Sequence, residues 1–247
     1  MEFLLALQFL TRLPITINKP VDGKNLGRSM ALFPIVGLMV GGATAALHYI
    51  LSLVFPLPVS DLISIIFLTI ITGNMHLDGL MDTADGFFSG KPLEAVLEIM
   101  KDSRVGSHGA AAGCLALLSK FIILGQIPPE FKVSALVLFP ILGRWAQVYA
   151  ASIYPYVRTG PGKSSFTSHV GLREILIASA FSMVTIIIVL GFKGWFLAAT
   201  TLISTALLGL YISKKIGGIT GDTLGALSEL IEVLGLLALC FLFVNYF

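Results

Sequence analysis

The stretch ILIASAFSMVTIIIVLGF, Ile175–Phe192, runs for 18 residues without a single charged side chain. A continuous apolar run of this length is what an α-helix needs to cross a lipid bilayer. The rest of the chain has the same character, since 56% of its residues are hydrophobic and only 12% are charged. The apolar runs are continuous rather than alternating, which favours helices over a membrane β-barrel. The sequence therefore predicts an all-α, polytopic membrane bundle.

We expect about seven transmembrane helices within one integral membrane domain, residues 1–247. The second candidate span is short and reaches bilayer length only if its helix continues into the stretch that follows. The candidate spans are Ala31–Phe55, Leu62–Met75, Ala110–Ile127, Val133–Tyr154, Ile175–Phe192, Trp195–Ser213 and Thr223–Phe247.

The distribution of basic residues predicts the orientation of these spans. With the amino terminus inside, the inner segments hold twelve of the sixteen Lys and Arg residues, whereas the outer loops hold only Lys132 and Lys193. This excess predicts a cytoplasmic amino terminus, an interfacial segment over residues 1–30, and cytoplasmic polar loops at 76–109, 156–173 and 214–222.

An acidic stretch, HLDGLMDTADG (His76–Gly86), follows the second span. On an α-helix, Asp78, Asp82 and Asp85 would share one narrow face. Like charges at that spacing repel one another, so a cation is expected to compensate them, and oxygen ligands favour Mg²⁺, with Mn²⁺ as the second choice. The alternative is a solvated, acidic helix end. His76 is either a ligand or a polar residue at the membrane interface.

Two further polar stretches suit phosphate groups, because they place basic side chains beside glycine-rich backbone. They are EIMKDSRVGSHGAAAG (Glu98–Gly113) and RTGPGKSSFTSH (Arg158–His169). Ordinary cytoplasmic loops would also be basic, so this pattern alone does not decide their role.

The last inner segment, GGITGDTLGALSELIE (Gly217–Glu232), carries an acid into an apolar run. Glu229 follows Asp222 by seven residues and would lie roughly 10 Å further along the helix. A buried acid needs a partner, for which Arg144 and Lys120 are the candidates. Either a structural ion pair or a substrate-binding role fits this pattern.

In their order along the chain, these motifs resemble the adenosylcobinamide-GDP ribazoletransferase (cobalamin synthase) family. The resemblance rests on FLTRLP (Phe9–Pro14), FPIVG (Phe33–Gly37), HLDGLMDTADG, IMKDSRVGSHG (Ile99–Gly109) and GGITGDTLGA (Gly217–Ala226). It implies that the 3′-hydroxyl of α-ribazole, or of α-ribazole 5′-phosphate, attacks adenosylcobinamide-GDP, so that GMP leaves and adenosylcobalamin or its 5′-phosphate forms. It also implies a divalent metal and residence in the cytoplasmic membrane of a prokaryote, with the active site facing the cytoplasm.

Roles for individual residues follow from this resemblance together with the chemistry of diphosphate displacement, which depends on charge neutralisation and positioning. Asp78, Asp82 and Asp85 are expected to bind the metal. Catalytic roles are expected for Asp82, Asp85 and Asp102. The expected substrate-binding residues are Lys101, Arg104, Arg158, Lys163, Asp222 and His76.

Two other functions remain open at this point. Asp82-Thr83-Ala84-Asp85-Gly86 is similar to the start of the CDP-alcohol phosphotransferase motif, but the rest of that motif is missing. An ion-coupled transporter would also place acids in membrane helices, although it usually shows repeated halves, and this chain shows none. The resemblance further allows a homo-oligomer or a complex with other late cobalamin-pathway enzymes, and nothing in the sequence indicates nucleic-acid binding.

Overall fold

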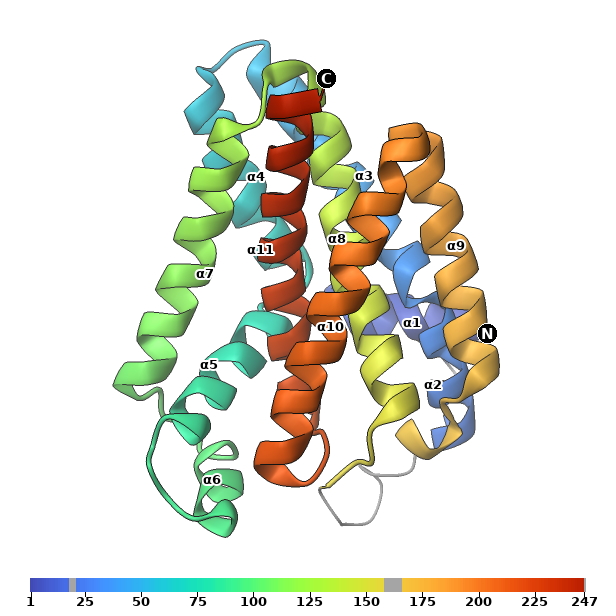
Figure 1. The fold of residues 1–247 in the computed structure, drawn as a ribbon, viewed down its shortest axis with the longest axis vertical. Coiled ribbons are helices and arrows are strands. Elements are labelled where there is room, and N and C mark those ends of the chain that lie inside the picture. Colours follow the sequence, from blue (N-terminus) through green and yellow to red (C-terminus); the bar gives the residue numbers. More distant parts are fainter. Residues whose placement is uncertain (18–20, 158–165, 247) are drawn as a thin grey trace.

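The computed structural model describes residues 1–17, 21–157 and 166–246 and forms a bundle of helices (Figure 1). It is 82% helical, and its described residues contain no strand beyond an isolated bridge between Tyr156 and Ile219. The prediction of an all-α fold is therefore confirmed. The helices are α1 (Glu2–Leu10), α2 (Gly23–Ser29), η1 (Met30–Leu32), α3 (Phe33–Ser52), α4 (Leu57–Ile71), α5 (Met75–Phe87), α6 (Leu93–Ile99), α7 (Ser107–Gln126), α8 (Pro129–Ile153), η2 (Thr167–His169), α9 (Leu172–Leu190), η3 (Gly191–Lys193), α10 (Gly194–Ile216) and α11 (Gly221–Tyr246).

Five helical stretches of the described chain are long and apolar enough to cross a membrane, or six if the bent pair α4 and α5 forms one crossing. One of the five, Leu172–Ile216, contains both α9 and α10, which lie side by side in Figure 1. A multi-pass membrane protein is thus supported. The expected number of about seven crossings remains a prediction, because it requires α9 and α10 to cross separately and the bent pair α4 and α5 to form one crossing.

The helix of the second candidate span does not continue straight into the acidic stretch, so that span reaches bilayer length only as a bent pair of helices. α4 ends at Ile71, and α5 leaves at an angle of 85°. Gly73 and Asn74 both adopt left-handed backbone conformations, with φ of 65° and 62°, and these turn the chain. Arg12 lies against this corner, because its backbone N–H donates to the Ile71 carbonyl and its guanidinium donates to the Gly73 carbonyl.

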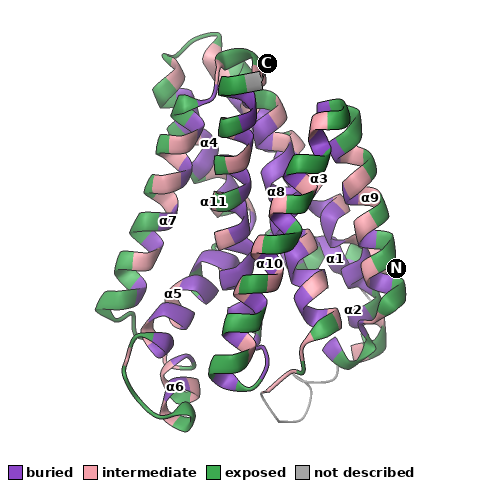
Figure 2. Ribbon diagram, in the orientation of Figure 1, coloured by how far each residue is buried: buried purple, intermediate pink, exposed green. Residues whose placement is uncertain are grey.

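The centre of the bundle is α8, which packs between α3 and α11 (Figure 1). Close approach of α3 requires small residues, since a β-carbon at Gly41 would lie 2.7 Å from the Val137 carbonyl oxygen. The outer helices instead expose large apolar side chains, such as Ile188 and Leu207 (Figure 2). A buried centre with apolar outer faces is the pattern expected where lipid replaces water around the bundle.

The polar segments gather at one end of the molecule. α5, α6 and the turn between α10 and α11 lie together at the lower end in Figure 1. These segments include the predicted polar loops 76–109 and 214–222, whereas much of 156–173 lies outside the described residues. α1 buries Leu5, Ala6 and Leu10 against the bundle. The interfacial position of residues 1–30 and the cytoplasmic side of this end remain predictions.

Candidate active site

A cavity of about 220 Å³ opens at this polar end, where α1, η1, α3, α5, α8 and α11 meet. Its lining has two parts. The polar part is formed by His76, Asp78, Gln147 and Asp222, and the apolar part by Phe9, Met30, Phe33, Met75, Phe166 and Leu224, with Gly221 and Gly225 completing the wall. The cavity therefore brings together side chains from most of the sequence motifs singled out above.

Two glycines allow α5 and α11 to meet closely at the cavity wall. A β-carbon at Gly79 would lie 2.6 Å from the Asp222 carbonyl oxygen, and one at Gly225 would lie 3.1 Å from the His76 carbonyl oxygen. Because neither glycine carries a side chain, the backbones can touch. Asp78 and Asp222, from helices far apart in the sequence, are thereby held at one cavity.

A buried arginine contacts the imidazole ring of His76 and fixes its orientation. Its Nδ1 lies 3.3 Å from a guanidinium nitrogen of Arg144, and both side chains are almost fully buried. The Nε2 of His76 has no hydrogen-bond partner among the described residues. The imidazole thus lines the cavity with one nitrogen engaged by Arg144.

A cluster of four buried charges supports Arg144. Lys120 of α7 donates to Glu229 at 2.7 Å and to Glu232 at 2.5 Å, and Arg144 of α8 pairs with Glu232. Two positive and two negative side chains therefore balance within the bundle, as buried ions require. The prediction that Lys120 or Arg144 would partner the buried Glu229 is confirmed, with Lys120 as the direct contact.

Asp85 binds backbone amides in this structure. Its carboxylate accepts hydrogen bonds from the Gly106 N–H at 2.7 Å and from the Gly109 N–H at 2.8 Å. These amides open α7, so Asp85 caps that helix from another segment of the chain. The glycines fit this contact, because a β-carbon at either position would lie within 2.4 Å of a carboxylate oxygen.

The three aspartates of α5 share one helical face, as predicted, but they are spread along it. Asp78 lies at the cavity, Asp85 binds the start of α7, and the half-buried Asp82 lies between them. The described residues contain no group of three or more His, Cys, Asp or Glu side chains arranged to hold a metal ion. The metal and catalytic roles of Asp82 and Asp85 remain predictions.

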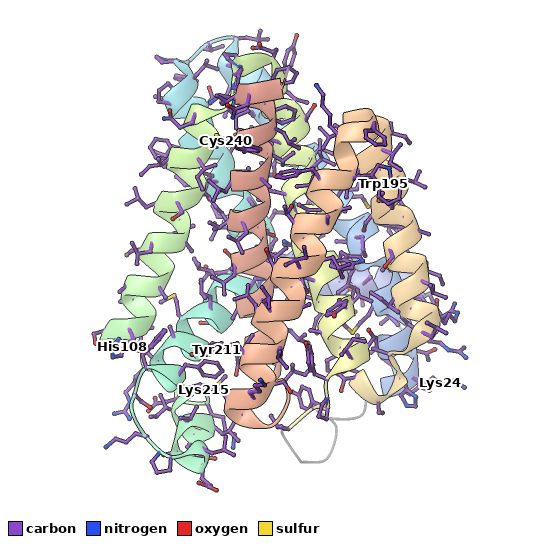
Figure 3. The ribbon with its side chains drawn as sticks, in the orientation of Figure 1. Lys24, His108, Trp195, Tyr211, Lys215 and Cys240 are labelled. Carbon is purple, nitrogen blue, oxygen red and sulfur yellow. The ribbon has the colours of Figure 1, made fainter. Side chains whose placement is uncertain are left out.

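The loop before α7 pairs its charges locally. Lys101 contacts Glu98 at 2.6 Å, and Arg104 contacts Asp102 at 2.5 Å; Asp102 is half-buried, whereas the other three side chains are exposed. Hydrogen bonds from the Arg104 side chain and backbone lower the pKa of Asp102 from 3.8 to about 2. None of these residues lines the cavity. Figure 3 shows His108, at the start of α7, at the outer edge of the molecule, where its ring lies against Phe88.

Arg158 and Lys163 lie outside the described residues, so their predicted contacts with substrate remain predictions. Sequence reasoning missed Gln147 and the apolar wall. Gln147 follows Arg144 by three positions and therefore shares its helical face, which is a signal that was present. Phe9 and Phe33 belonged to motifs that supported the resemblance, but their positions alone did not indicate a common cavity.

Comparisons with known proteins show which family this chain resembles. A family model described as cobalamin-5-phosphate synthase matches residues 2–240. The adenosylcobinamide-GDP ribazoletransferase of Clostridium acetobutylicum is 37% identical, over 93% of this chain and 91% of that protein. The protein of the same name from Thermoanaerobacter pseudethanolicus is 38% identical, over 99% and 98%, and the one from Klebsiella pneumoniae is 35% identical, over 96% and 98%. The comparison with solved structures found no match.

Proposed function

Because the chain belongs to the cobalamin-5-phosphate synthase family, we propose that it is the membrane transferase that joins α-ribazole to adenosylcobinamide-GDP in cobalamin biosynthesis. The relatives carry the name of this reaction over more than nine-tenths of their length. The observation that carries the proposal is the cavity, because Phe9, Phe33, Asp78 and Asp222 come from four separate family-like motifs and line one site.

In this reaction the 3′-hydroxyl oxygen of α-ribazole attacks the phosphorus that bears the aminopropanol arm of the corrinoid. A new P–O bond forms, the bond from phosphorus to the bridging oxygen breaks, and GMP leaves with that electron pair. The hydroxyl proton passes to a carboxylate. α-Ribazole 5′-phosphate reacts in the same way and gives the 5′-phosphorylated product.

Asp78 and Asp222 are the carboxylates placed to receive this proton, since both line the cavity. Asp102 is less suited to that role. Its carboxylate is held by Arg104 and has a pKa of about 2, so it accepts a proton poorly near neutral pH. The catalytic assignment of Asp102 is thereby weakened by both its position and its basicity.

The carboxylate oxygens that line the cavity are ligands that suit Mg²⁺ or Mn²⁺. Mg²⁺ is commonly held by one or two carboxylates and completes its coordination with substrate phosphate oxygens and water. Asp78 and Asp222 supply two carboxylates of this kind. When bound, the ion would neutralise charge on the diphosphate as it is displaced.

The first turn of α11 also favours binding of the diphosphate, because Gly221 and Asp222 line the cavity there. The amino-terminal end of a helix carries a partial positive charge, which attracts anions. Lys101 and Arg104 are exposed at this end of the molecule and could approach the diphosphate when the donor binds. We place this end at the cytoplasmic face of a prokaryotic cell membrane, where both water-soluble substrates are available. A homo-oligomer or a complex with other late-pathway enzymes would be compatible with that placement.

The direct test uses the purified chain in lipid nanodiscs with adenosylcobinamide-GDP, α-ribazole and Mg²⁺. We expect adenosylcobalamin by mass analysis and an equal amount of GMP. Asp78→Asn and Asp222→Asn should each lower turnover more than 100-fold, about 2.7 kcal/mol or more of transition-state stabilisation. Glu130→Gln, an exposed acid at the start of α8, is the matched control and should leave turnover unchanged.

Other outcomes would point to other functions. CMP release from a CDP-linked donor, without GMP release, would favour a CDP-alcohol phosphotransferase. Cation-coupled uptake into vesicles without either product would favour a transporter. Turnover that persists in a strong chelator would contradict the role given to the divalent ion.

A further inference from the structure

Two buried polar atoms at the cavity have no protein partner. His76 Nε2 and Gln147 Oε1 make no hydrogen bond within the described part of the chain, although their residues are only 2% and 4% exposed. Both residues line the cavity. Most buried polar groups in folded proteins are paired, and leaving one unpaired destabilises the fold. Two such atoms at one cavity indicate a polar group of a ligand.

The hydrogen-bonding roles of these atoms are complementary. A guanidinium has donors only, so the contact with Arg144 makes the Nδ1 of His76 an acceptor. The proton of the neutral ring then lies on Nε2, which becomes a hydrogen-bond donor. Gln147 Oε1 is an acceptor. A hydroxyl group satisfies both, because it accepts one hydrogen bond and donates another.

The other part of the cavity is aromatic. The Phe9 ring stacks on Phe33 with centroids 5.8 Å apart, and it contacts Phe166 at 6.3 Å. Met30 adds to the same wall. Such a surface stacks well on a flat ring, but it cannot satisfy the donors and acceptors along the edge of a guanine. It therefore suits a base with an apolar edge.

The size of the cavity excludes the bulk of the donor substrate. At about 220 Å³ it is smaller than the roughly 300–1,000 Å³ typical of pockets that enclose a drug-sized ligand. A corrin macrocycle cannot enter, whereas a nucleoside base with its sugar hydroxyl at the polar end is of suitable size.

We propose that this cavity is the subsite for the acceptor nucleoside, a riboside of an apolar, benzimidazole-type base. The base lies against Phe9, Phe33 and Phe166, and a ribose hydroxyl lies between His76 and Gln147. This places the attacking 3′-hydroxyl of the sugar beside Asp78 and Asp222, where its proton is removed. His76 and Gln147 are positioning residues that bind the other ribose hydroxyl. The donor diphosphate meets Asp78 and Asp222 at the mouth of the cavity, and the corrin ring stays outside. The assignment rests on the proposed function.

Steady-state kinetics of the full chain in nanodiscs test the assignment. Each substrate is varied while the other is saturating, for the unaltered enzyme and for Phe9→Ala, Gln147→Leu and the control Phe192→Ala. Phe9 is 39% exposed, so its truncation spares the core, and Phe192 is an exposed phenylalanine outside the cavity. Loss of one stacking or hydrogen-bonding partner should raise the KM for α-ribazole about tenfold, with the KM for adenosylcobinamide-GDP changed less than about twofold.

A second measurement needs no variant and is independent of folding. The unaltered enzyme should use a benzimidazole α-riboside at least about tenfold more efficiently, by kcat/KM, than the α-riboside of adenine, whose edge is polar. Equal or better use of the adenine nucleoside would overturn the proposal. A rise in the KM for adenosylcobinamide-GDP alone in Phe9→Ala or Gln147→Leu would overturn it too, because the guanosine would then occupy the cavity. Absence of GMP release by the unaltered enzyme would instead refute the proposed function itself.

Discussion

Replacing Lys120 with methionine should lower the free energy of unfolding by about 3–5 kcal/mol, the usual cost of breaking a buried ion pair. The ammonium group of Lys120 contacts both Glu229 and Glu232, and the side chain is only 3% exposed. After the change, Arg144 is left as the only cation of the cluster against two buried carboxylates. Methionine matches the length of the lysine stem, so lost packing contributes little and the uncompensated charge accounts for most of the cost.

The charge-balanced double variant Lys120→Met/Glu229→Leu separates charge from packing. It removes one charge of each sign and keeps the pair between Arg144 and Glu232. We therefore expect it to recover most of the lost stability, with a coupling energy of about 2 kcal/mol or more.

Reversible unfolding in mixed micelles with increasing sodium dodecyl sulfate, followed by far-ultraviolet circular dichroism, measures these free energies. Lys214→Met, at an exposed position near the end of α10, should stay within about 0.5 kcal/mol of the unaltered protein. A cost below about 1 kcal/mol for Lys120→Met, or a double variant as unstable as the sum of the singles, would refute the reasoning.

Three further changes test other contacts. Asp85→Asn puts an N–H donor in place of one of the oxygens that accept from the backbone at the start of α7. It should lower the free energy of unfolding by about 1–2 kcal/mol in the same assay. An unchanged free energy of unfolding would contradict the role of Asp85 as a helix cap. Arg104→Gln should raise the pKa of Asp102 from about 2 toward 3.8, as read by carbon NMR of the carboxylate. Because that pKa is lower in the folded protein, the contact stabilises above about pH 4 and is lost as the pH falls through about 2. Gly79→Ala would press a methyl group on the Asp222 backbone, so GMP release should fall at least tenfold, and normal turnover would show that α5 and α11 need not touch.

Much of the fold was predictable because lipid imposes a simple rule on sequence. Apolar runs such as Ile175–Phe192 must satisfy their own backbone hydrogen bonds, so they form helices whatever their neighbours do. The same argument found a partner for Glu229, since a charge in an apolar run requires a counter-charge and the bundle spans offer few.

The site was only partly predictable, because its geometry depends on contacts between distant segments. Helical spacing placed Asp78 and Asp85 on one face, yet it could not show that Asp85 would cap α7 while Asp78 faced a cavity. The break at Gly73 was not predicted, although Thr72, Gly73 and Asn74 interrupt the apolar run before Met75, and glycine and asparagine favour left-handed turns. Gln147 was missed because a lone amide within α8 carries no charge that demands an explanation.

The turn at Gly73 and Asn74 makes the position of the aspartate-bearing face of α5 depend on the backbone dihedral angles of two residues. Were Asn74 a valine, whose branched side chain resists positive φ, α4 and α5 would tend toward one straight rod, and the aspartates would be carried into the hydrocarbon. A water-borne substrate as large as a corrinoid could then reach none of them. A turn of two residues therefore sets the direction in which the aspartates of α5 leave α4.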